Sequence, residues 1–119
     1  MVRARWEEFT AEMSDADLEL LNAYRTAALD RPDVEERVHK TEVQYARQRI
    51  FTSGFVRSHR LEIAVDLLRS VEHPLLRDAF HTTKKVITHR FTISQIDELD
   101  GDIIDWVAEA HDTVGRGTR

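Results

Sequence analysis

The chain has 119 residues, a formal net charge of −5 and no cysteine. Its length suits one domain with a hydrophobic core, its 41% hydrophobic and 33% charged residues are typical of a soluble globular protein, and disulfides, thiolate zinc sites and cysteine nucleophiles are excluded. No apolar run approaches the roughly 20 residues that span a bilayer and no signal segment is visible, so we expect a cytoplasmic protein without a membrane partner.

Helical spacing marks the first part of the chain. Trp6, Phe9 and Met13 predict a short helical extension over residues 1–13. Ser14 then reads as the cap of a longer helix, because its hydroxyl can accept a backbone N–H. That helix is expected to end before Pro32, since proline disfavours a helical residue at the preceding position. Its apolar stripe consists of Leu18, Leu21, Tyr24 and Ala28.

After residue 33 the spacing of the apolar residues changes from that of a helix to that of a strand. Strands are expected over 34–40, 43–46 and 50–57, with Gly54 at a bulge or a close approach. The clearest signal follows at 60–67, where Leu61, Ile63, Val65 and Leu67 alternate with Arg60, Glu62, Ala64 and Asp66. A strand separates these two sets onto its two faces, whereas a helix would mix them.

The C-terminal part alternates between helix and strand signals. Pro74 suits the first position of a short helix that carries Leu75, Leu76, Ala79 and Phe80. A last strand is expected over 84–93, with Ile87, His89, Phe91 and Ile93 on one face. A final amphipathic helix is expected from Ile96 to Val114, with acids at its start that favour the helix dipole.

These elements predict an α+β fold with one antiparallel sheet of about four to five strands and N-terminal and C-terminal helices packed on one face. The domain would cover residues 14–114, after the extension at 1–13 and before a disordered tail at 115–119. The opposite face of the sheet is expected to be wetter. Its residues are Arg60, Glu62, Asp66, Thr88, Arg90 and Thr92.

Several short motifs carry a resemblance to a known family. They are the segment 38–47 followed by Phe51, the strand 61–68, the segment 86–91, and the pair Glu98-Leu99-Asp100 and 106–110. Over residues 14–114 the chain resembles small bacterial domains of unknown function that are distantly similar to YdhG-like proteins, some of which carry an iron-chaperone label. The resemblance implies an α+β fold and no established activity.

The first candidate site lies between sheet and helices. His89 falls on the expected core face, where it is either a satisfied core histidine or a polar group in a pocket. Lys40, Tyr45 and Arg47 come from neighbouring strands and can join it. An ammonium, a phenol, a guanidinium and an imidazole around an apolar cup suit a small anionic ligand. The open sheet face is the second candidate surface.

Two uneven charge blocks suggest alternative functions. The segment 47–60 interleaves Arg47, Arg49, Arg57 and Arg60 with Phe51 and Phe55, a pattern that can bind single-stranded nucleic acid. The acidic net charge and the lack of a stacking motif argue against it. The final helix carries Asp102, Asp105 and Glu109, which could bind a hard cation in an iron-chaperone-like role.

No catalytic signature is visible. A Gly-framed nucleophile turn and a phosphate-binding glycine motif are both missing from the sequence, and nothing calls for a cofactor. Trp6 and Phe9 lie ahead of the resembling region, where they would cover a sheet edge or bind a second copy in a homodimer. We therefore expect a non-enzymatic binding or accessory module for a small ligand or a protein partner.

Overall fold

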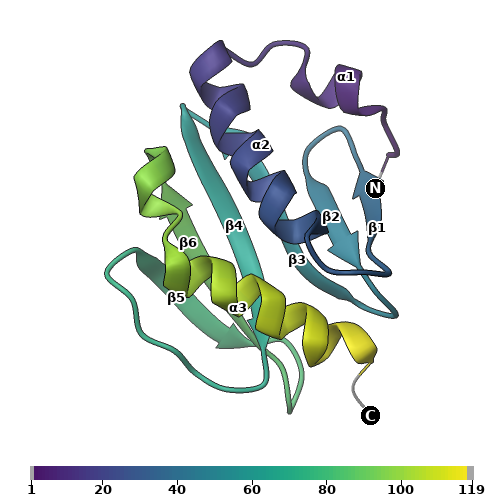
Figure 1. The fold of residues 1–119 in the computed structure, drawn as a ribbon, viewed down its shortest axis with the longest axis vertical. Helices are drawn as coiled ribbons and strands as arrows, with labels where there is room; N and C mark the ends of the chain where they lie inside the picture. Colours follow the sequence, from purple (N-terminus) through teal and green to yellow (C-terminus); the bar gives the residue numbers. More distant parts are fainter. Residues whose placement is uncertain (1, 118–119) are drawn as a thin grey trace.

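Six antiparallel strands form one open sheet, and the computed structural model describes it within residues 2–117 together with three α-helices (Figure 1). The helices are α1 (Trp6–Thr10), α2 (Asp15–Leu29) and α3 (Gly101–Asp112). The strands are β1 (Glu35–Val38), β2 (Val43–Ala46), β3 (Ile50–Arg57), β4 (Arg60–Leu67), β5 (Leu76–His81) and β6 (Ile87–Ile93). Two 3-10 turns, η1 (Ile96–Glu98) and η2 (Val114–Arg116), flank α3. The α+β class and the antiparallel sheet are confirmed.

The strand order in the sheet is β1-β2-β3-β4-β6-β5. β3 and β4 form a tight hairpin whose two turn residues, Ser58 and His59, have φ values of 52° and 63°. Positive φ at both positions is what a two-residue turn needs to match the twist of the strands. His59 also places its Nδ1 3.0 Å from Oδ2 of Asp17, which joins the hairpin to the first turn of α2.

The strand alternation predicted for β4 is confirmed, since Leu61, Ile63, Val65 and Leu67 are all buried. Figure 1 shows α2 and α3 lying across the same side of the sheet. Tyr24 of α2 approaches Gly54, and its hydroxyl lies 2.9 Å from the Thr52 hydroxyl. The sequence of small and β-branched residues on β3 thus makes room for a phenol ring over the middle of the sheet.

The cap predicted at Ser14 is confirmed, because its hydroxyl accepts the backbone N–H of Asp17. Asp100 does the same for α3 by accepting the N–H of Ile103 at 3.0 Å. Because this cap starts α3 only at Gly101, the helix predicted from Ile96 is divided into η1 and α3. α1 likewise ends at Thr10, before Met13.

The predicted strand count is too low, and the helix expected after Pro74 is instead strand β5. Leu76, Ala79 and Phe80 have a spacing that fits either structure over so short a segment. The backbone pairing with β6, in which Asp78 faces Arg90 and Phe80 faces Thr88, decides for the strand. The spacing of the apolar residues within the segment does not show this pairing with the next strand.

The N-terminal segment lies along the β1 edge of the sheet. Ala4 donates its N–H to the Val38 carbonyl, and Lys40 donates to the Val2 carbonyl. The guanidinium of Arg25 lies 3.9 Å from the centre of the Trp6 ring, and Phe9 packs edge-on against Trp6. The two hydrogen bonds satisfy backbone groups at the end of the β1 edge that would otherwise be open.

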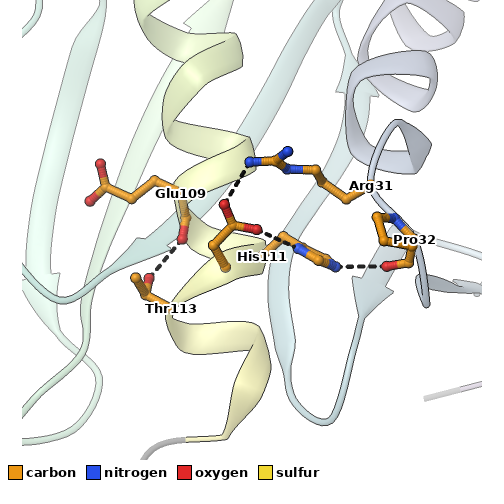
Figure 2. A network of polar contacts seen from close by, with 6 residues as sticks. Arg31, Pro32, Glu109, His111 and Thr113 are labelled. Carbon is orange, nitrogen blue, oxygen red and sulfur yellow. Dashed lines mark hydrogen bonds and ion pairs between the residues drawn. The ribbon is translucent and has the colours of Figure 1, made fainter.

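A polar network joins the end of α3 to the chain that follows α2 (Figure 2). His111 directs Nε2 to the Pro32 carbonyl at 2.8 Å and Nδ1 to Oδ1 of Asp112 at 2.9 Å. A carbonyl oxygen can only accept, so Nε2 donates to Pro32, while Nδ1 faces the Asp112 carboxylate. Asp112 also bonds Arg31, and its hydrogen bond to His111 holds the pKa of the Asp112 carboxyl below its usual value.

The C-terminal residues that the structure describes are ordered against β3. The Gly115 carbonyl accepts the backbone N–H groups of Gln48 and Arg49. Of the tail expected at 115–119, residues 118–119 lie outside the described part. Within residues 2–117 no helix has both the length and the apolar composition that crossing a bilayer requires.

Candidate functional site

Tyr45, predicted to line a sheet–helix pocket, is instead bonded inside a cluster of side chains. It is buried on β2 and donates its hydroxyl to Oε2 of Glu36 at 2.8 Å. Glu36 also accepts two hydrogen bonds from Arg25, both 2.8 Å long. Burial raises the pKa of the Tyr45 phenol well above its ordinary value. The phenol therefore stays protonated and ties β2 to β1 and α2.

His89 is fully buried on β6, and both ring nitrogens are hydrogen-bonded to backbone. Nε2 accepts the N–H of Val71 at 3.2 Å, so Nδ1 carries the proton and donates it to the Ile87 carbonyl at 3.1 Å. The neutral ring thereby fastens the segment after β4 to the sheet. All of the polar capacity of the ring is used by the fold.

The four residues expected in the sheet–helix pocket are spread across the molecule. Tyr45 and His89 lie in one row of the sheet, but Thr52 of β3 and Val65 of β4 stand between them. Lys40 is exposed in the β1–β2 connection. Arg47 follows β2 and lies beside Gly115.

The four arginines of the basic segment divide between the two ends of β3. Arg57 and Arg60 face each other at the β3–β4 turn, whereas Arg47 and Arg49 precede β3. Phe51 is buried and packs edge-on against His111 on the helix side. Phe55 is half-buried on the other face. The segment therefore does not form one continuous basic stripe.

The acids of the final helix are also engaged separately. Glu109 forms an ion pair with Arg69 at 2.9 Å, while Asp102 and Asp105 are exposed. Asp102 instead lies near His73 and Asp100, with one potential ligand atom from each within 4.8 Å of the others. Nδ1 of His73 accepts the Leu75 N–H, so Nε2 carries the proton that Asp100 accepts at 2.7 Å. His73 thus serves as a link between the β4–β5 connection and the α3 cap.

The face of the sheet opposite α2 and α3 contains a hollow of about 500 Å³. Its floor is formed by two small residues, Ser53 of β3 and Ala64 of β4, which are direct neighbours in the register. The row continues to Arg90 of β6 and Asp78 of β5. Phe55 borders the hollow beside Ser53. Small side chains in the centre of a row of longer ones account for the depression.

The charged residues around the hollow are three arginines, Arg57, Arg77 and Arg90, and three acids, Glu42, Glu62 and Asp78. Glu62 accepts a 2.5 Å hydrogen bond from the Thr92 hydroxyl and lies 3.6 Å from Nη1 of Arg77. Within residues 2–117, the ion pairs include neither Arg57 nor Arg90. The Arg90 guanidinium is 5.9 Å from the centre of the Phe80 ring. Among the described residues, Arg57 and Arg90 therefore line the hollow without a carboxylate as ion-pair partner.

Sequence reasoning placed Glu62 and Arg90 on the wetter face but missed the site around them. Arg77 and Asp78 fell in the segment assigned to a helix. Ser53 and Ala64 carry no motif, and their adjacency depends on the pairing of β3 with β4. The period-two pattern of residues 60–67 is the part of the sequence that indicates this site, because it assigns Glu62 and Ala64 to the same face.

Asp66 lies two residues beyond Ala64 on the same face. Its Oδ1 accepts the Thr88 hydroxyl at 2.7 Å, and Thr88 is in turn hydrogen-bonded to Thr82. Burial raises the pKa of the Asp66 carboxyl, although the Thr88 hydrogen bond and nearby Arg49 oppose this effect. The carboxylate form is therefore less favourable in the folded chain than in the unfolded chain.

We expect Asp66→Asn to stabilise the protein at pH 7. A carboxyl whose pKa is raised by folding lowers stability as pH rises from its unfolded pKa through its folded pKa, and the amide keeps the acceptor for Thr88 without the charge. The gain should therefore disappear as pH falls towards 3. Urea unfolding of both proteins between pH 3 and 7 measures this, with Asp97→Asn as an exposed control. A gain independent of pH would contradict the explanation.

Comparison with known proteins supplies one finding about this fold. A model of the family described as "Domain of unknown function (DUF5655)" matches residues 8–114, which include α2, the whole sheet and α3. The search of curated proteins and the search of solved structures gave no match. The hollow, with all the residues that line it, lies inside the matched region. The chain therefore belongs to the DUF5655 family.

Proposed function

We propose that this domain is a binding module that holds a small ligand on the open face of its sheet. The observation that supports it is the pair Arg57 and Arg90, which line a hollow of about 500 Å³ and take part in no ion pair within residues 2–117. Ligand sites have volumes of about 300–1,000 Å³, so a metabolite-sized molecule fits. The ligand's recognised group is an oxyanion, either a carboxylate or a phosphate.

The physical reason lies in the geometry of the guanidinium group. Its planar fork of N–H donors matches two oxygens of a carboxylate or phosphate at once, and it remains charged at every physiological pH. Ser53 adds a hydroxyl two strands away from Arg90, and Ala64 leaves space above the sheet between them. Phe55 offers an apolar wall to the rest of the ligand.

We expect Arg90→Ala to weaken the binding of small carboxylates or phosphate monoesters by about 10-fold to 100-fold. A hydrogen bond to a charged group contributes roughly 1.5–3 kcal/mol, and about 1.4 kcal/mol corresponds to a tenfold change. Calorimetric titration with the tightest acid from a thermal-shift screen measures it. Arg57→Ala should act in the same direction. Arg116→Ala, which removes the same charge from η2, is the matched control.

Two results would contradict the proposal. The first is a screen in which neither carboxylates nor phosphate monoesters raise the melting temperature, because a ligand that prefers the folded state must do so. The second is binding that survives Arg57→Ala and Arg90→Ala but is lost in Lys40→Ala. That pattern would place the ligand near the β1–β2 connection instead.

A further inference from the structure

The hollow on the open face contains carboxylates as well as guanidiniums. Asp78 of β5 is the direct cross-strand neighbour of Arg90. Glu42, just before β2, lies on the opposite flank, where Gln44 donates a hydrogen bond to it at 3.0 Å. Neither acid takes part in an ion pair within the described residues. Both signs of charge are therefore presented to the same space.

The charged side chains around the hollow are of two kinds: those that pair with each other, and those that form no ion pair within the described residues. Glu62 and Arg77 form an ion pair, which leaves Arg57, Arg90, Asp78 and Glu42 without an ion-pair partner among the described residues. A purely anionic ligand would pair with the guanidiniums but bring its own charge next to two carboxylates. Like charges brought together in this way weaken binding. A ligand with one anionic and one cationic group pairs with both kinds of side chain.

The relative positions of Arg90 and Asp78 restrict the class of ligand further. Opposite charges directly across two strands usually pair with each other, yet these two do not come within ion-pair distance, and Arg90 lies over Phe80 instead. Neighbouring strands are about 4.8 Å apart, so an anion-binding and a cation-binding side chain stand side by side. This arrangement suits a ligand whose two charges are separated by one carbon atom.

We infer that the ligand is a zwitterion of the α-amino acid type, with its carboxylate at Arg90 and its ammonium group at Asp78. This inference rests on the proposed function and specifies the ligand class of the same site. Ser53 and Phe55 line the same hollow, where they offer a hydroxyl and an apolar surface to the rest of the ligand. Arg57 and Glu42 lie at the rim and contact whatever polar groups the side chain carries.

The test uses pairs of molecules that differ only in the ammonium group. Phenylalanine is compared with 3-phenylpropanoate, and glutamate with glutarate, by calorimetric titration of the full chain. The amino acid of at least one pair should bind at least tenfold more tightly than its deaminated partner. Asp78→Asn should abolish that difference while leaving the affinity for the deaminated acid unchanged or slightly increased. Asp105→Asn, an exposed acid on α3, is the matched control.

The outcomes separate the inference from the proposed function. If the deaminated acids, or the other carboxylates and phosphate monoesters of the screen, bind as tightly as the amino acids, the zwitterion assignment is overturned and the binding site stands. The same holds if Asp78→Asn weakens both members of a pair equally. If no acid of either kind binds, the proposed function fails together with the inference. Because Asp78 is exposed, an unchanged melting temperature of the variant will show that its fold is intact.

Discussion

Replacing His89 by alanine should lower the free energy of unfolding by about 3 kcal/mol or more. The substitution leaves a cavity under β6, and truncations of large buried side chains cost about 2–5 kcal/mol. It also removes the acceptor of the Val71 N–H and the donor to the Ile87 carbonyl, and an unsatisfied buried group costs roughly 1–3 kcal/mol. Urea unfolding followed by tryptophan fluorescence gives the value.

The control for this prediction is His81→Ala. His81 is exposed on β5, and its only side-chain bond among the described residues is to the nearby Thr83 carbonyl. Surface substitutions of this kind usually change stability by less than about 0.5 kcal/mol. If His89→Ala proved as mild as His81→Ala, the account of His89 as a structural residue would be wrong. A loss of ligand binding without loss of stability would then favour a role for His89 in a ligand pocket between the sheet and the helices.

Gly54→Ala should destabilise the protein by about 2 kcal/mol. A Cβ atom at this position would lie 2.9 Å from Cε2 of Tyr24 and 3.2 Å from Cγ2 of Ile63. The Tyr24 ring cannot easily withdraw, because its hydroxyl is bonded to Thr52 and the ring packs against Tyr45. Extra methyl groups in a filled core typically cost about 1–3 kcal/mol. Chemical unfolding of the variant measures the loss.

Gly101→Ala serves as the opposite case in the same chain. A Cβ atom there meets no atom of the described residues within 4 Å, and Gly101 is the first residue of α3. Alanine reduces the freedom of the unfolded chain and favours the helix, so a gain of about 0.4–1 kcal/mol is expected. If both substitutions changed the free energy of unfolding equally, the space over Gly54 would not restrict the size of the residue at that position.

Much of the fold follows from local pattern. The alternation at 60–67 and 87–93 places the apolar residues of each strand on one face, because successive side chains of a strand point to opposite faces. Ser14 signals the start of α2 through its capping hydroxyl. Strand β5 was not predicted, because the three apolar residues Leu76, Ala79 and Phe80 are too few to distinguish helical spacing from strand spacing. Only the pairing of that segment with β6 makes it a strand.

The site was less accessible from the sequence, for a physical reason. The residues that face the hollow come from five strands or their ends, and the sequence does not show that β4 pairs with β6 or that β5 lies at the edge. His89 illustrates the same limit. Its place on the buried face was predicted, but the Val71 N–H that occupies its Nε2 comes from a connection whose path depends on the completed fold.

NMR titrations with phenylalanine and with glutamate test the open-face site most directly. The Ala64 methyl group and the Nε–Hε signals of Arg57 and Arg90 report on the hollow, whereas the buried Ala110 methyl group of α3 and the Arg69 Nε–Hε signal report on the helix side. We predict saturable shifts of the first three signals and none of the last two. Shifts confined to the helix-side signals, or no shifts with either amino acid at millimolar concentration, would contradict the assignment of the open sheet face as the amino-acid site.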